Sequence, residues 1–378
     1  MAVTKIGLRN AWFQVHKWIG LILAIAIIPI SITGAALVWH DALDDWLNPQ
    51  RVVEGTATLP PRAYVSAAAN ALAPGERLIS VRIPEKGPVV ASAARASQKG
   101  GGRPVRTSIW IDPTTARVLD RAGSNEGAVR IMHVLHGSLY IPEWGRPIVG
   151  WVGVAMLLSS MTGLWLWWPT VGSWLKGLRW RRHNNLDTNL HHLMGFWISI
   201  PLFIASLTGV WISFPQVFAH FNGAEAQAPR EAGPSRQQRM RAQPLAAPAT
   251  SLDTALAGAT AATPGTVSQI GWPTDVEPDW TIAVRPAKGR PAQVKIADAT
   301  GAATVTPPEP RETETTARLM RRIHDGDGMG IVWQVIVFLG GLLPALLSIT
   351  GLIMWWRARG WKANLKQRQR TRKLQPAE

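Results

Sequence analysis

Four stretches of the sequence contain no Asp, Glu, Lys or Arg and are long enough to cross a lipid bilayer. They cover residues 19–38, 147–169, 193–214 and 331–356. An α-helix rises 1.5 Å per residue, so roughly 20 apolar residues span the hydrocarbon core. Four such stretches in one chain are typical of a membrane protein. We therefore expect four transmembrane helices, the first of which is too long for the usual cleaved signal and stays as an anchor.

Basic residues are concentrated beside these stretches. Residues 1–18, 170–190 and 357–378 contain 15 Lys and Arg but only two acidic residues, so they hold 13 of the net charge of +16. The positive-inside rule then places both termini and the loop between the second and third spans in the cytoplasm. Because the charge is explained by topology, we expect no nucleic-acid partner. The sequence predicts a multi-pass protein of a bacterial inner membrane.

The spans divide the chain into eight segments. We expect a cytoplasmic N-terminus and first span over residues 1–39, a first outer domain over 40–146, a second span over 147–169, a basic cytoplasmic loop over 170–190, a third span over 191–214, a linker and second outer domain over 215–326, a fourth span over 327–356 and a basic cytoplasmic tail over 357–378. The expected fold class is a mainly α membrane protein with two periplasmic α+β domains.

Each outer domain has the pattern of one short helix followed by strands. The expected helices cover residues 63–72 and 252–259, and the expected strands cover 78–83, 89–94 and 108–111 in the first domain and 267–271, 280–284 and 294–296 in the second. The stretch from 224 to 248 is rich in Pro, Gly and Arg and is expected to be a mobile linker.

Two spacings between a histidine and a Thr-Gly pair occur twice each. His16 precedes Thr33-Gly34 by 17 residues, as His191 precedes Thr208-Gly209, and His136 precedes Thr162-Gly163 by 26 residues, as His324 precedes Thr350-Gly351. Recurrence of both spacings indicates a tandem duplication in which a span, an outer domain and a second span are repeated.

A duplicated chain places equivalent histidines at equivalent depths in the membrane. His16 and His191 are expected to begin outward-running helices at the cytoplasmic face, and His136 and His324 to begin inward-running helices at the outer face. The sequence contains no Cys, which excludes iron–sulfur clusters, thiolate zinc sites and thioether-linked haem. Two histidines at one depth on facing helices can be the axial ligands of a b-type haem. We therefore predict two haem b, with these four histidines as iron ligands.

The four glycines of the Thr-Gly pairs are candidate haem contacts. A helix of 17 residues is roughly 25 Å long, so Gly34 and Gly209 are expected at the depth of the outer histidines. Gly163 and Gly351 are expected toward the inner histidines. A glycine allows a flat macrocycle to approach a helix backbone, whereas small residues in membrane helices also serve as helix-packing contacts. Both interpretations remain open.

Other histidines compete for the ligand role. His133 lies one helical turn before His136, and His192 directly follows His191. The repeated spacings favour His136 and His191, so His133 and His192 are the alternative ligands. His40 and His220 follow the first and third spans and are either surface residues or substrate contacts.

Several of these motifs together resemble one known family over roughly residues 10 to 357. They are His16-Lys-Trp-Ile-Gly20 and His191-His-Leu-Met-Gly195, Met132-His-Val-Leu-His-Gly137 and Ile323-His-Asp-Gly326, the Thr-Gly-Leu-x-x-Trp-Trp endings of the second and fourth spans, and the Asp-Pro-Thr and Asp-x-Thr-Gly turns. The chain is similar to the PepSY-associated transmembrane family, and within it most similar to the inner-membrane di-haem ferric-siderophore reductases of the ferrioxamine type.

The resemblance implies a haem-dependent oxidoreductase that reduces an iron(III)-siderophore in the periplasm. Members fused to flavin reductase modules differ from this chain, which has no Gly-rich nucleotide motif, so its electron donor is expected to be a quinol, a separate flavin reductase or a soluble reductant. No catalytic residue beyond the haem ligands is expected. The alternatives are a haem-free transport or accessory protein of iron uptake, and a haem quinol oxidase subunit that serves another periplasmic acceptor.

Overall fold

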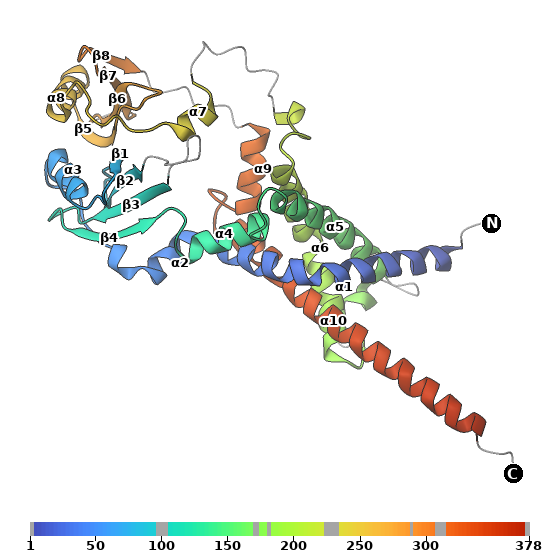
Figure 1. Cartoon of the computed structure of the whole chain (residues 1–378). Helices are drawn as coiled ribbons and strands as arrows, with labels where there is room; N and C mark the ends of the chain where they lie inside the picture. The colour runs from blue at the N-terminus through green and yellow to red at the C-terminus, as the bar shows by residue number, and fades with distance from the viewer. Residues whose placement is uncertain are drawn as a thin grey trace. The chain divides into compact units, whose positions relative to one another are not determined.

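The computed structural model describes residues 4–95, 105–168, 174–179, 183–222, 234–287, 290–306 and 315–374. The chain folds into two compact units. The first contains residues 1–40, 131–226 and 314–378, and the second contains residues 41–130 and 227–313. The first unit holds the long helices and the second holds the strands (Figure 1).

Four helices of the first unit are long and apolar enough to cross a membrane, which confirms the four expected spans as helices. They are α1 (Lys5–Leu37), α5 (Gly145–Trp167), α6 (Leu186–Ser213) and α10 (Ile331–Leu374). α1 packs against α5 and α10, and α6 packs against the same two helices, so the four form a bundle. Ile25 and Ile200 on its surface are 85% and 66% exposed. An extensive apolar exterior of this kind suits contact with lipid rather than water.

α1 and α6 begin earlier than their apolar stretches predict, which changes where His16 and His191 lie in these helices. α1 starts at Lys5, where the side chain of Thr4 caps the helix by accepting from the backbone N–H of Gly7 at 3.1 Å. His16 and His191 therefore lie inside α1 and α6 and do not begin them, as the sequence had suggested. Helical hydrogen bonding continues through the polar residues at the membrane boundary, where hydropathy gives no signal.

His136 and His324 also do not begin the membrane-spanning helices. They lie near the ends of two separate short helices, α4 (Ala128–Ser138) and α9 (Thr316–Asp325). Leu139 and Tyr140 after α4 have positive φ angles, and so does Gly326 after α9. A left-handed residue ends a helix, and this break allows the next helix to run in a new direction.

The second unit is built on one eight-stranded antiparallel sheet. Its strands are β1 (Glu76–Arg82), β2 (Val89–Arg95), β3 (Val105–Ile111), β4 (Val118–Gly123), β5 (Thr266–Gly271), β6 (Asp279–Arg285), β7 (Ala292–Ala297) and β8 (Ala303–Thr306). Their order is β4-β3-β2-β1-β5-β6-β7-β8. Val81 of β1 pairs with Ile270 of β5, which joins two four-stranded halves of matching order.

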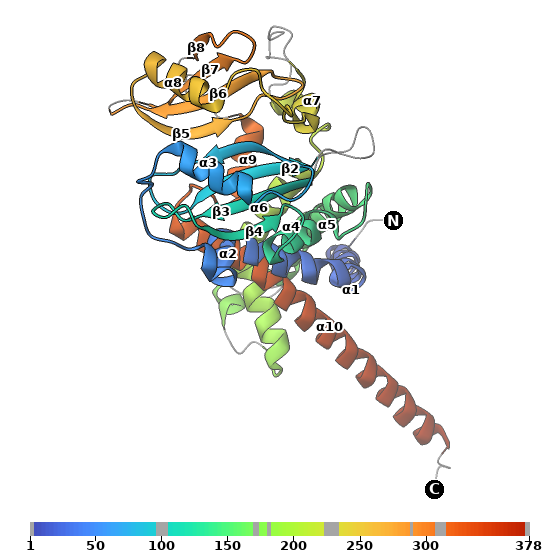
Figure 2. The same cartoon turned by 60° about the vertical axis from the view of Figure 1, so that its left-hand side comes forward.

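Joining the halves corrects the expectation of two separate outer domains. α3 (Pro61–Asn70) contacts β1 to β3, and α8 (Leu252–Ala262) contacts β6 to β8 (Figure 2). The buried residues of both helices and both half-sheets form a single hydrophobic core that includes Tyr64, Ile109, Ala255 and Ile282. The physical reason is the unpaired edge of β1 and of β5, because pairing them satisfies the backbone groups that each half alone would expose.

Several elements were not expected from the sequence. β4 and β8 extend the two half-sheets, and α7 (Arg236–Arg241) interrupts the expected linker with a capping box at Ser235 and Gln238. Residues 224–233 of that linker lie outside the described residues. The remaining elements are α2 (His40–Leu47), η1 (Pro49–Arg51), η2 (Trp174–Leu178) and η3 (His220–Asn222).

Candidate metal centres formed by two histidine pairs

His16 of α1 and His191 of α6 face each other inside the helical bundle. Their ring centroids are 6.3 Å apart and their ring planes are nearly perpendicular, at 87°. The two residues come from different helices that are far apart in the sequence, so this pair forms only when the helical bundle assembles.

His136 of α4 and His324 of α9 form the second pair in the same helical unit. Their ring centroids are 6.0 Å apart and the ring planes are inclined by 43°. Desolvation lowers the pKa of His136, and desolvation together with the neighbouring His136 lowers the pKa of His324 to about 4. Both imidazoles are therefore neutral near pH 7, the form in which imidazole binds a metal.

Each of the four histidines packs against the glycine of one Thr-Gly pair. A Cβ added to Gly34 would lie 2.6 Å from Cε1 of His136, and one added to Gly209 would lie 3.1 Å from Cε1 of His324. At the other pair, a Cβ added to Gly163 would lie 3.1 Å from Cε1 of His16, and one added to Gly351 would lie 3.5 Å from Cε1 of His191. Gly34 and Gly209 thus lie beside the outer histidines, and Gly163 and Gly351 lie beside the inner ones, as the spacings predict. Their contact with a macrocycle stays a prediction.

The Nδ1 atoms of the histidines also share one type of partner. His136 Nδ1 is 2.8 Å from the carbonyl of Ile30, His16 Nδ1 is 3.2 Å from that of Ser159, and His324 Nδ1 is 3.0 Å from that of Ala205. Nδ1 of His191 lies 2.9 Å from the hydroxyl of Thr350, and the backbone of Leu347 is a further hydrogen-bond partner of this residue. Every one of these carbonyls lies four residues before the glycine that the ring contacts. Since a carbonyl only accepts, each Nδ1 carries the proton and each Nε2 keeps a free lone pair.

This arrangement fits a metal ion held between each pair. Metal–imidazole bonds are about 2 Å long, so two rings on opposite sides of one metal ion have centroids roughly 6 Å apart. Metal-binding histidines almost always donate their second ring N–H to a carbonyl, a carboxylate or water. Within the described part of the chain, no group of three or more His, Asp or Glu is placed to hold a metal ion. The donor set observed at each candidate centre is two imidazoles, which suits a haem with two histidine ligands.

The competing histidines have other neighbours. His133 faces His40, with centroids 6.1 Å apart, and His192 faces His183 at 4.7 Å. The ring of His192 also lies beside that of its chain neighbour His191, with centroids 6.4 Å apart. Among the ring contacts of the described residues, neither His133 nor His192 contacts His16, His136 or His324. His220 lies in η3 and is next to the ring of Phe221. The structure therefore brings together the four histidines that the repeated spacings select.

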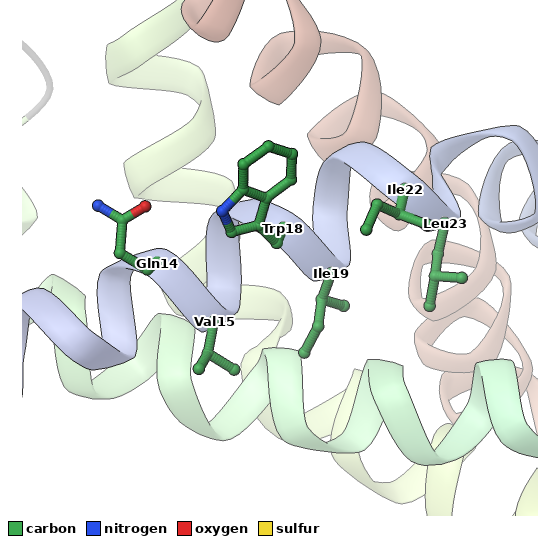
Figure 3. A pocket seen from close by; sticks show the side chains of 6 residues that line it. All are labelled: Gln14, Val15, Trp18, Ile19, Ile22 and Leu23. Carbon is green, nitrogen blue, oxygen red and sulfur yellow. The ribbon is translucent and has the colours of Figure 1, made fainter.

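The one hollow described on the helical unit lies elsewhere. It is lined by a single face of α1, and Figure 3 shows its side chains in two rows spaced four residues apart: Gln14, Val15, Trp18, Ile19, Ile22 and Leu23. Its lining is apolar apart from Gln14, and His16 is not part of it. Such an open apolar surface is suited to lipid chains rather than to redox chemistry.

Comparison with known proteins identifies the family. A family model described as the PepSY-associated TM region matches residues 13–358. The chain belongs to the PepSY-associated transmembrane family. No curated protein matches it. In this PepSY-associated protein the matched region includes both histidine pairs and the whole eight-stranded sheet.

Sequence reasoning missed the backbone carbonyls that hold the rings. A carbonyl has no side-chain signature, and the only available signal was its constant position four residues before each glycine. On a helix, residues four apart lie on one face, so a ring that packs over the glycine meets that carbonyl. The ion pair between Arg357 and Asp187, 2.6 Å long, was also not anticipated. It joins α10 to the first turn of α6, one helical turn before His191.

Proposed function

We propose that this PepSY-associated protein is a di-haem b oxidoreductase of a bacterial inner membrane. It carries electrons from the cytoplasmic side to the periplasm, where an iron(III)-siderophore is reduced and iron(II) is released. The observation that supports this proposal is the presence of two histidine pairs with ring centroids 6.3 and 6.0 Å apart, each with free Nε2 lone pairs.

The two pairs contact α1 at two well-separated positions, the first through His16 and the second through Gly34. His16 contacts Gly163, and 17 residues further along α1 comes Thr33, followed by Gly34, which contacts His136. At 1.5 Å per residue, that distance is roughly 25 Å, close to the thickness of the hydrocarbon core. Two redox centres at such positions can accept an electron near one membrane face and deliver it near the other.

The residues of the chain have defined tasks in this proposal. A bound haem b supplies reversible one-electron chemistry at its iron. Each pair of histidines would hold one haem through Nε2, while the carbonyls fix the orientation of the rings and the glycines leave room for each ring to approach the helix. With two histidines as the protein ligands of each haem, the centres would favour electron transfer over oxygen activation.

Orientation follows from charge. The 15 basic residues of the three segments flanking the spans indicate that His16 and His191 lie near the cytoplasm and His136 and His324 near the periplasm. The donor is a quinol, a flavin reductase or a soluble reductant, and it supplies one electron for each iron(III) reduced.

The substrate chemistry explains why one electron is sufficient for release. Hydroxamate and catecholate oxygens are hard ligands that favour iron(III). Adding one electron gives an iron(II) chelate with the same ligands but weaker binding. Iron(II) then exchanges to other ligands, and the chelator is left intact.

The test begins with the absorption spectrum of the detergent-purified protein, oxidised and dithionite-reduced, with haem quantified as its pyridine complex. We expect a six-coordinate b-type spectrum, loss of one haem in His16→Ala or His191→Ala, and loss of the other in His136→Ala or His324→Ala. His133→Ala and His192→Ala are the matched controls and should keep both haems. The reduced protein is then mixed with iron(III)-desferrioxamine and an iron(II)-specific chelator.

Each other outcome selects an alternative. A colourless protein despite adequate haem supply removes the oxidoreductase proposal and favours a haem-free transport or accessory role. A protein that contains haem but does not reduce the iron(III) chelate favours a quinol oxidase subunit with another periplasmic acceptor.

A further inference from the structure

Three threonine hydroxyls contact the histidine rings directly. Oγ1 of Thr350 lies 2.9 Å from Nδ1 of His191, and Oγ1 of Thr208 lies 3.0 Å from Nδ1 of His324. Oγ1 of Thr162 lies 3.2 Å from Nδ1 of His16. Each threonine directly precedes the glycine against which the same ring packs.

The proton of each hydroxyl is already used within its own helix. Thr162 donates to the carbonyl of Leu158 at 2.8 Å, Thr208 to that of Ile204 at 2.8 Å, and Thr350 to that of Leu346 at 2.9 Å. A hydroxyl has one proton and two lone pairs. Toward the histidine, each threonine can therefore only accept, so the N–H must belong to Nδ1.

The fourth threonine differs from the other three. Like them, Thr33 donates within its own helix, to the carbonyls of Pro29 and Ile30 at 2.6 and 3.1 Å. Among the hydrogen bonds of the described residues, none joins Thr33 to His136, whose Nδ1 has the carbonyl of Ile30 alone. The outer pair thus contains one ring with two acceptors, His324, and one ring with a single acceptor, His136.

We propose that Thr162, Thr208 and Thr350 are positioning residues that, as second acceptors, reinforce the Nδ1-protonated tautomer of His16, His324 and His191 and tune the metal that these rings would hold, whereas Thr33 has no such role. The inference rests on the proposed function for the nature of the metal group. A hydrogen bond accepted from Nδ1–H makes the imidazole a stronger electron donor at Nε2. This favours iron(III), so each of the three threonines lowers the reduction potential of its centre.

The chain offers a matched pair of variants at the outer centre. Thr208→Val removes the acceptor while keeping the branched shape, and Thr33→Val makes the same change at the repeat-matched position without a histidine contact. A spectroelectrochemical titration of the full-length protein resolves the two midpoint potentials, and the one lost in His324→Ala belongs to the outer centre. We expect Thr208→Val to shift only the outer potential upward, Thr208→Ser to restore it, and Thr33→Val to leave both unchanged. Thr350→Val should shift only the inner potential.

A second readout does not require haem. In apo-protein labelled with ¹⁵N-histidine, magnetic resonance of the imidazole nitrogens reports the tautomer. We expect His324 to be Nδ1-protonated in the parent protein and to gain Nε2-protonated population in Thr208→Val, but not in Thr33→Val. A colourless protein that shows this tautomer change refutes the proposed function and keeps the threonine assignment. Equal shifts of the midpoint potential in Thr208→Val and Thr33→Val refute the threonine assignment itself. Unchanged midpoint potentials in both Thr208→Val and Thr350→Val refute it as well.

Discussion

Gly34→Ala gives a sharp test because the new methyl group has no space. Its Cβ would lie 2.6 Å from Cε1 and 2.9 Å from Nδ1 of His136. Carbon atoms in contact are about 3.5–4.0 Å apart, so the ring must retreat by about 1 Å. Overpacking of this size costs about 1–3 kcal/mol. Metal–ligand distances tolerate only about 0.2 Å, so we expect His136 to lose its place as a ligand.

The matched control is Gly351→Ala. There the added Cβ would lie 3.5 Å from Cε1 of His191, an ordinary contact. Both glycines lie within helices, so both variants gain about 0.5–1 kcal/mol of helix stability, and this gain cancels in the comparison. Only the contact with the histidine ring distinguishes them.

The assay is the haem content per chain together with the reduced absorption spectrum. We expect Gly34→Ala to lose the outer haem and Gly351→Ala to keep both haems. Full haem content and an unchanged spectrum in Gly34→Ala would show that His136 does not depend on this contact, and the outer centre as described here would then be incorrect.

Two further predictions concern the bundle and the sheet. A Cβ on Gly341 of α10 would lie 2.8 Å from the backbone nitrogen of Ala35 in α1, whereas one on its neighbour Gly340 would lie 3.9 Å from Pro201. Thermal unfolding in detergent should show Gly341→Ala destabilised by about 1–3 kcal/mol and Gly340→Ala close to the parent protein, and equal melting of the two would contradict this helix contact. In the sheet unit, Glu76 accepts from Thr107 at 2.7 Å and from Arg121 at 2.8 Å. Burial raises its pKa, but these bonds and the backbone N–H of Ala73 outweigh burial and lower it overall. The ionised Glu76 therefore adds to the free energy of unfolding above about pH 4.3, and this contribution is lost as the pH falls through the lowered pKa. Glu76→Gln should unfold more easily than the parent protein at pH 7, and the difference in unfolding free energy between the two should shrink in acid. A difference that grows in acid would refute that sign.

Much of the candidate site was predictable because the number of residues between two positions on a helix gives their relative depth in the membrane. The distances of 17 and 26 residues matched each histidine with a Thr-Gly step. The spacing of 17 lies within one helix, whose constant rise converts it into a position across the membrane, whereas the spacing of 26 crosses the break between a short helix and a membrane helix. The expected strands 89–94 and 280–284 correspond to β2 and β6, since alternation of buried and exposed residues is a local signal.

Other features depended on contacts between segments far apart in the chain. The pairing of Val81 with Ile270 merges two apparent domains into one sheet, and no local pattern in either strand specifies its partner. The breaks at Leu139 and Gly326 place His136 and His324 on separate short helices, although hydropathy shows only the apolar stretches that follow.

The sequence by itself determined the four membrane helices and the four histidines that share two spacings to a Thr-Gly pair. Only the tertiary structure decided that the rings meet at 6.3 and 6.0 Å, that His133 faces His40 and not the outer pair, and that Thr33 differs from its three counterparts. The physical reason is that composition and periodicity fix the depth and face of a residue on its own helix. The separation, orientation and hydrogen-bond partners of a ring are set by packing against other helices.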